Sequence, residues 1–272
     1  MNAPVSPSVR LHLQSQGQGR PLLSLHSSSG SHAQWRALAE LLTRRGGHQL
    51  LMPDLHGHGR SPAWPAQAAD SLRIDALAAL ACLDGVEEPV DLVGHSYGGA
   101  VALQLALLQP QRVRSLLLYE PVAFGLLRRY EPQGEAWQQI RRIAAMVADK
   151  PREEAARLFT DYWSGGSGWL QLNTAQQATI AERIATVSRH FNALFAADWG
   201  RPELQRLRMP VLLVGGVLTR EPARRVSELL AAWLPDARQH WLTRAGHLGP
   251  LTHASQVAEL IADFVQREPA AA

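Results

Sequence analysis

The sequence predicts an α/β fold: a mainly parallel sheet flanked by helices, with a helical segment inserted into it. Short apolar runs alternate with helical patterns along most of the 272 residues, as is typical of βαβ units. One run, residues 90–93, leads through a glycine-rich turn at Ser96 into an apolar helix. Residues 122–200 instead carry helical patterns and four tryptophans without a clear strand. We therefore expect a core of residues 1–121 and 201–272 and a helical cap of residues 122–200.

The elements before the Ser96 turn follow from local patterns. Residues 9–13 are a candidate edge strand before a turn at 16–20, and residues 22–25 form an apolar strand that ends in a polar loop. Residues 35–42 have apolar side chains at helical spacing, followed by two arginines and two glycines, which is a usual helix end. Residues 49–52 predict a strand, residues 53–62 a glycine-rich loop and residues 70–83 a helix.

The alternation continues after the Ser96 turn and resumes beyond the cap. Residues 113–119 predict a strand that ends at Glu120. Residues 211–214 and 239–242 predict the last strands, and residues 222–234 and 253–267 predict helices. Loops at the carboxyl ends of such strands are where α/β proteins bind ligands.

The residues Gly94–His95–Ser96–Tyr97–Gly98 are typical of a nucleophile elbow. Such a turn holds a serine on a strained backbone at the carboxyl end of a strand and exposes its hydroxyl. Gly94 and Gly98 are expected there because a Cβ would collide with the neighbouring strand or helix. The pattern alone is common, so the prediction depends on the strand before it and the helix after it. The alternative is that Ser96 only caps the helix.

Composition excludes several classes of partner. The chain has 27 basic and 24 acidic residues, a net charge of +3, and no dense basic run with interleaved aromatic residues, so nucleic acid is not expected. Cys82 is the only cysteine, which excludes an internal disulfide and is typical of a reducing cytoplasm. No stretch reaches the roughly 18 apolar residues of a membrane span, and residues 1–10 lack a signal core. We expect a cytoplasmic protein that binds a small molecule, either as a monomer or as a homo-oligomer.

Four motifs follow one another along the chain. They are Leu25–His26–Ser27–Ser28, Asp54–x–x–Gly57–x–Gly59–x–Ser61, Gly94–His95–Ser96–Tyr97–Gly98–Gly99 and Gly246–His247. Together they resemble the α/β-hydrolase fold superfamily, in its branch with a serine nucleophile, and the resemblance covers almost the whole chain. It implies that a serine attacks a carbonyl, that a histidine takes the serine's proton, and that an acid holds the histidine.

The base and the oxyanion donors have clear candidates. A serine hydroxyl needs a positioned base, and His247, in a loop after the last predicted strand, is the best candidate; the alternative is a surface histidine. The resemblance implies that the backbone amides of Ser28 and Tyr97 form the oxyanion hole. Ser27 stands where the family usually has glycine, which alters the loop or adds a hydroxyl to the pocket.

The remaining histidines have plainer interpretations. His56 and His58 lack a third ligand nearby, so we expect neither a metal nor a cofactor. By resemblance, His26 and His95 shape the pocket floor. The others are expected alone on the surface: His12, His32, His48, His190 and His240.

The acid is the open question. The family usually carries an aspartate shortly after the strand at 211–214, but Thr219 stands there and cannot supply a carboxylate. Glu221 is one substitute, although it also fits as the first-turn acid of the following helix. Glu120, at the end of the strand after the elbow helix, is the other, and some branches of the fold carry their acid there. We favour Glu120, and a site of Ser96 and His247 alone stays open.

The resemblance and these residues predict a hydrolase that cleaves a carboxylic ester, or else an amide or lactone, through an acyl-Ser96 intermediate. Dehalogenases and epoxide hydrolases of the fold use an aspartate nucleophile. Ser96 stands at that position here, which argues against both classes. The alternatives are a carbon–carbon bond hydrolase, a cofactor-free haloperoxidase, or a non-catalytic ligand-binding member. The missing aspartate at Thr219 is the best support for the last of these.

Overall fold

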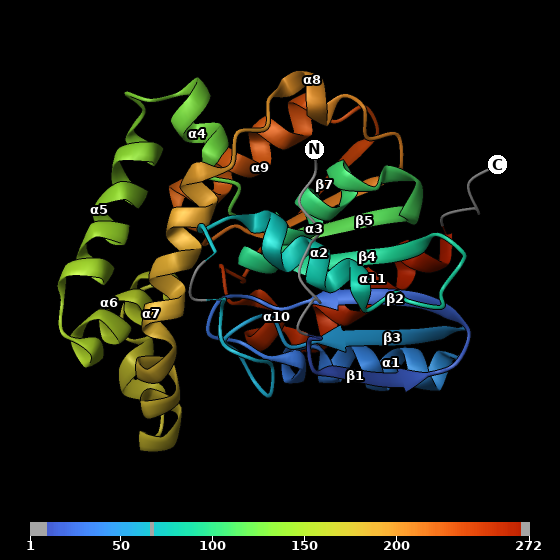
Figure 1. Cartoon of the computed structure of the whole chain (residues 1–272), viewed down its shortest axis with the longest axis horizontal. Helices are drawn as coiled ribbons and strands as arrows, with labels where there is room; N and C mark the ends of the chain where they lie inside the picture. The colour runs from blue at the N-terminus through green and yellow to red at the C-terminus, as the bar shows by residue number, and fades with distance from the viewer. Residues whose placement is uncertain (1–9, 66–67, 268–272) are drawn as a thin grey trace.

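The computed structural model describes residues 10–65 and 68–267, and its centre is a seven-stranded sheet (Figure 1). The spatial order is β1-β3-β2-β4-β5-β6-β7; β1 runs antiparallel to β3 and the other neighbouring pairs are parallel. The mainly parallel sheet is therefore confirmed. In chain order the strands are β1 (Leu13–Gly17), β2 (Arg20–Leu25), β3 (His48–Pro53), β4 (Val90–His95), β5 (Val113–Tyr119), β6 (Val211–Gly216) and β7 (Ala237–Leu242).

The predicted edge strand at residues 9–13 is wrong in position. Residue 9 lies outside the described residues, and β1 begins at Leu13, which pairs with Pro53 of β3. The strand continues to Gly17 because the turn to β2 is tighter than expected. Gly17 and Gly19 have φ values of 86° and 112°, which let the chain reverse within two residues.

Helices cover both faces of the sheet. Because side chains alternate along each strand, apolar side chains emerge on both faces, and each face packs against helices. In β5, Leu116 and Leu118 join one apolar cluster, and Leu117 and Tyr119 join the other. The first cluster also contains buried residues of α2 (Leu72–Ala81), α3 (Tyr97–Leu108) and α9 (Glu221–Trp233). The second contains those of α1 (Arg36–Arg45) and α11 (Ala254–Arg267). Four short helices complete the core: η1 (His32–Trp35), η2 (Pro110–Arg112), α8 (Arg201–Leu204) and α10 (Gly249–Thr252).

A helical insertion follows β5, and Figure 1 shows its helices α5, α6 and α7 to the left of the sheet. We use this name for α4 (Gly125–Tyr130), α5 (Glu135–Asp149), α6 (Arg152–Ser164), η3 (Gly168–Gln171) and α7 (Thr174–Ala196). Trp137, Trp163 and Trp199 are buried, in keeping with a packing role. Among the described helices, none is both long and apolar enough to cross a bilayer.

The sheet brings distant segments of the chain to one edge. The loops after β2, β3, β4, β5 and β6 all leave from the carboxyl ends of parallel strands. These ends meet at the same edge, as does that of β7, so the predicted site residues are neighbours in space.

Candidate active site

Ser96 lies in a strained turn between β4 and α3. Its φ and ψ are 55° and −118°, values that a residue with a side chain rarely adopts, and strain of this kind costs roughly 1–3 kcal/mol. Two glycines make the turn sterically feasible. A Cβ on Gly94 would come within 2.4 Å of the Gly98 carbonyl oxygen, and one on Gly98 within 2.4 Å of the carbonyl oxygens of Leu25 and His26.

Three of the predicted residues form one continuous hydrogen-bond chain. His247 Nε2 lies 2.8 Å from Ser96 Oγ, and His247 Nδ1 lies 2.7 Å from Glu120 Oε2. All three side chains are buried, and Glu120 has no exposed surface. With a carboxylate on Nδ1, the imidazole carries its proton there and turns the unprotonated Nε2 toward the serine hydroxyl. The arrangement can therefore remove a proton from Ser96.

The Glu120 carboxylate is held by the segment after β6, where an aspartate was expected and Thr219 stands instead. Its backbone has a φ of 42°, and its Oε1 accepts a hydrogen bond from the Gly216 N–H at 2.8 Å. The hydroxyl of Thr219 donates to Oε2, the oxygen that also faces His247. Thr219 thus stands at the family's usual acid position and holds the carboxylate that reaches the histidine from β5. Glu221 is the exposed first residue of α9, where its charge suits the helix dipole.

The two predicted oxyanion donors are backbone N–H groups near Ser96. Tyr97 is the first residue of α3, so its N–H has no acceptor within the helix. The Ser28 N–H, in the loop after β2, has no acceptor among the described residues. Ser28 and Ser96 both line the same small cavity, which places Ser28 close to the Ser96 hydroxyl.

The segment of residues 26–32, which we call the Ser28 loop, is braced by buried polar groups. His26 Nε2 accepts the Leu55 N–H at 2.9 Å, and its Nδ1–H donates to the Ser27 carbonyl. The unusual Ser27 donates both its N–H and its hydroxyl to Oε1 of Gln34, at 3.1 and 2.9 Å. The Ser27 hydroxyl is therefore used within the loop, and neither Ser27 nor His26 lines the small cavity.

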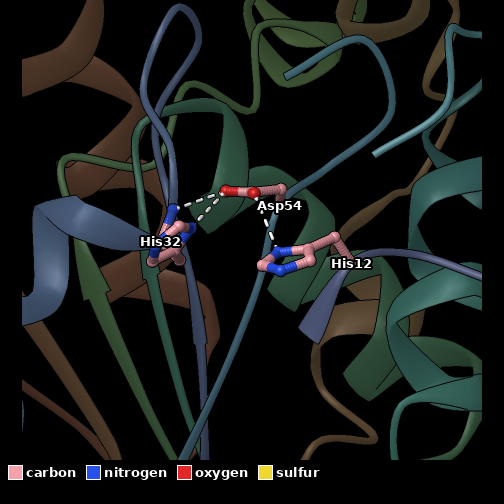
Figure 2. Close-up of side chains that lie close together, drawn as sticks. All are labelled: His12, His32 and Asp54. Carbon is pink, nitrogen blue, oxygen red and sulfur yellow. Dashed lines mark hydrogen bonds and ion pairs between the residues drawn. The ribbon is translucent and has the colours of Figure 1, made fainter. Parts of the chain in front are cut away.

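Figure 2 shows Asp54 between His12 and His32, which were expected alone on the surface. His32 Nδ1 lies 2.9 Å from Oδ1 of Asp54, and His12 Nδ1 lies 3.1 Å from Oδ2. The backbone N–H groups of His32 and Arg60 donate to the same two oxygens. Four donors use the acceptor capacity of one buried carboxylate, so we interpret this His–Asp–His cluster as a brace between three loops.

The expectation of surface histidines is also wrong for His48 and His190, which are 2% and 1% exposed, whereas His240 is exposed. His190, on α7, lines the small cavity and lies 2.8 Å through Nδ1 from the Ser28 hydroxyl. A signal for it was present in the sequence. Arg183, Val187, His190 and Leu194 recur at helical spacing on one side of α7, and this side faces the site.

Burial keeps four histidines in this part of the structure uncharged: His26, His58, His95 and His190. It lowers the pKa of His26 to about 4 and that of His58 to about 3, because a desolvated imidazolium is unfavourable. The pKa values of His95 and His190 also lie well below the usual 6.5, for the same reason. These rings therefore act as neutral hydrogen-bonding groups.

Two cavities adjoin the hydrogen-bond chain. The small one has a volume of about 10 Å³, about the space of one water, and its lining is mostly apolar: Val122, Phe124, Phe159, Trp163, Val187, Phe191 and Leu194, with Ser28, Ser96 and His190. A second space, a groove of about 800 Å³, is lined by His247 among other residues. Trp163 borders both, with its ring centroid 3.9 Å from that of His247. Any larger group bound in the small cavity has to displace side chains that line it.

Known proteins resemble this chain along most of its length. The family model of the alpha/beta hydrolase fold matches residues 20–254. The chain is 28% identical to a 2-hydroxymuconate semialdehyde hydrolase of Pseudomonas sp. (strain CF600), covering 98% of this chain and 94% of the relative. It is 32% identical to a pimeloyl-[acyl-carrier protein] methyl ester esterase of Neisseria meningitidis serogroup C, over 78% of this chain and 81% of that protein. A solved hydrolase from Pseudomonas aeruginosa is 27% identical and superimposes with a TM-score of 0.74, covering 93% of each chain.

Proposed function

Because the chain belongs to the alpha/beta hydrolase fold family, we propose that it is a serine hydrolase that cleaves a carboxylic ester through an acyl intermediate on Ser96. One observation carries the proposal: the unbroken chain of hydrogen bonds from Ser96 through His247 to the buried Glu120. A hydroxyl, an imidazole and a carboxylate in this order are the groups that acyl transfer needs. The same arrangement argues against a member that only binds a ligand.

In the proposed reaction, His247 Nε2 takes the Ser96 proton while Oγ bonds to the carbonyl carbon. The carbonyl oxygen becomes an oxyanion, which the N–H groups of Ser28 and Tyr97 stabilise. The tetrahedral intermediate then expels the alcohol, which leaves with the proton from His247. A water molecule repeats these steps on the acyl enzyme, gives its proton to His247, and releases the carboxylic acid and free Ser96. Glu120 keeps its negative charge throughout and stabilises the transient imidazolium.

The two cavities support separate binding places for the two parts of an ester, the acyl group and the alcohol. The small apolar cavity is lined by Ser96 and by Ser28, so we assign the acyl group to it. The groove is lined by His247, which must reach the leaving oxygen, so we assign the leaving alcohol to the groove. In this proposal the helical insertion serves as a cap whose side chains make room for the acyl group.

The test is hydrolysis of p-nitrophenyl acetate and butyrate by the wild-type protein and by Ser96→Ala. We expect turnover that disappears in the variant, together with covalent labelling of the wild type, and not of Ser96→Ala, by a fluorophosphonate. Turnover that survives the substitution would refute the acyl-Ser96 intermediate.

A specific observation favours a second candidate, a carbon–carbon bond hydrolase. The likeness to a 2-hydroxymuconate semialdehyde hydrolase extends over nearly the full length of both chains. The same serine and histidine would then act on a ketone carbon. Turnover of 2-hydroxymuconate semialdehyde with a kcat/KM well above that of every ester would favour this candidate, whereas the reverse ranking favours the esterase.

A further inference from the structure

We propose that α7 of the helical insertion positions the oxyanion donors, through Arg183 and His190. The inference rests on the proposed function, because it takes the N–H groups of Ser28 and Tyr97 as those donors. The observations behind it are contacts from one side of α7 to the Ser28 loop and to Tyr97. In this proposal, α7 both covers Ser96 and holds the two oxyanion donors in place.

The core of the protein holds the two ends of the Ser28 loop, and in the middle of the loop His58 accepts the Ser29 N–H. At the first end, His26 bonds to the Leu55 N–H and Ser27 bonds to Gln34. At the other end, the backbone N–H and ring of His32 bond to Asp54, as Figure 2 shows. Among the described residues, the other side-chain hydrogen bonds to the middle of the loop, residues 28–30, come from α7.

Arg183 holds the backbone of that middle part. Its Nη1 donates to the carbonyl oxygens of Ser29 at 2.7 Å and Gly30 at 2.9 Å. Ser29 has a φ of 62°, a left-handed conformation that is unfavourable for serine, and its N–H donates to His58 Nε2 at 3.0 Å. Strained residues persist where the surroundings fix them from several sides. Arg183 supplies the contact on the carbonyl side, so without it we expect the loop to relax and the neighbouring Ser28 N–H to turn.

His190 touches both residues that carry the proposed donors. Its Nδ1 lies 2.8 Å from the Ser28 hydroxyl, and its ring stacks on that of Tyr97 with 3.5 Å between centroids and 4° between planes. The ring is 1% exposed. His190 therefore joins the loop after β2 to the first residue of α3 through a single rigid group.

The same side of α7 lines the cavity that must open. Val187, Phe191 and Leu194 face the small apolar space beside Ser96. If α7 moves to admit an acyl group, Arg183 and His190 move with it. The oxyanion donors are then correctly placed only when α7 is seated, which couples closure over the substrate to catalysis. Arg183 and His190 act as positioning residues, since their effect passes through the Ser28 loop.

The test compares Arg183→Gln with Arg189→Gln, a matched change on the same helix. Arg189 bonds to Asp70 and to the Ala68 carbonyl, so its loss removes contacts of α7 that do not involve the Ser28 loop, and Asn192 of α7 still bonds to Asp70. We expect Arg183→Gln to lower kcat on p-nitrophenyl butyrate at least tenfold with KM within threefold. It should weaken an aryl trifluoromethyl ketone, whose adduct places an oxyanion at the donors, by a similar factor. Arg189→Gln should stay within threefold in all three quantities. Equal losses in the two variants, or a change in KM alone, would overturn the proposal.

Two further variants test the proposal if Arg183→Gln does not fold. Arg183→Lys keeps a single cationic donor and should recover part of the lost kcat. Ser28→Ala removes only the hydroxyl that meets His190 and should lower kcat about threefold to tenfold. If Arg183→Lys is as impaired as Arg183→Gln and Ser28→Ala behaves as wild type, the positioning role is wrong.

Hydrogen–deuterium exchange of the peptide covering residues 26–34 needs no turnover. It should accelerate in Arg183→Gln and not in Arg189→Gln, and identical exchange in the two variants would refute the inference. If the wild type cleaves no ester and forms no ketone adduct, the proposed function fails, and exchange alone then decides whether α7 positions the loop.

Discussion

Replacing Glu120 by glutamine tests the hydrogen-bond chain at its least expected member. In the structure three donors converge on the Glu120 carboxylate: the Gly216 N–H, the Thr219 hydroxyl and the His247 Nδ1–H. A carboxamide has one acceptor oxygen and an NH₂ group, so at least one of these donors must face another donor. Glu120→Gln therefore disturbs the orientation of His247 and also removes the charge that stabilises the imidazolium.

The geometry sets the size of the effect. Opposite charges 2.7 Å apart attract by about 6 kcal/mol at an effective dielectric constant of about 20. The amide dipole retains part of this, so we expect a loss of about 4 kcal/mol in the transition state, which is about a thousandfold in kcat. The corresponding change in a serine protease triad lowers kcat by about 10⁴-fold.

The assay is kcat on p-nitrophenyl butyrate, with the rate of fluorophosphonate labelling of Ser96 as a second measure and circular dichroism as the check on folding. Glu221→Gln is the matched control and should remain within twofold of wild type, because Glu221 is exposed on α9. A folded Glu120→Gln that retains more than a tenth of wild-type kcat, or a greater loss in Glu221→Gln, would refute the assignment of the acid.

Three further predictions concern the support of the site. Thr219→Val removes a donor to the buried Glu120 carboxylate, and hydrogen bonds to charged groups contribute about 1.5–3 kcal/mol; we expect kcat/KM to fall about tenfold, and an unchanged value would contradict the role of the hydroxyl. Because the pKa of buried His26 is about 4 in the folded protein and 6.5 when exposed, the unfolded chain binds more protons below pH 6.5. Stability is thus complete above pH 6.5 and is lost as the pH falls toward 4, by about 2 kcal/mol at pH 5 for this residue, and urea titrations should show a shallower pH dependence in His26→Gln. Gly98→Ala should lower the free energy of unfolding by about 3 kcal/mol or more, because the new Cβ meets two carbonyl oxygens at 2.4 Å, whereas Gly85→Ala, which meets open space at a φ of 83°, should cost only about 1 kcal/mol in thermal melts.

The sequence alone was sufficient for the fold class and for proposing two residues that the structure brings into hydrogen-bond contact, Ser96 and His247. Alternating apolar runs and helical patterns reflect interactions between residues close in the chain, so β2, β3, β4, β5, β6 and β7 lie within a few residues of their predicted ranges. Ser96 was predictable because the glycines of its motif meet a local steric need, and His247 because it lies in a short loop directly after the last predicted strand. The same local logic misplaced β1, whose position depends on its pairing with β3.

Only the tertiary structure decided how the rest of the site is assembled. Glu120 and Glu221 both lie between Ser96 and His247 in sequence, and only the order of strands places Glu120, at the end of β5, against the histidine. His190 was taken for a surface residue. The helical spacing around it indicates one side of α7, but it does not reveal that this side lies over Ser28, more than 160 residues earlier. Chain order carries little information about such distances, because a parallel sheet gathers loops from the whole chain at one edge. There, burial and hydrogen bonding to remote segments determine what each side chain does.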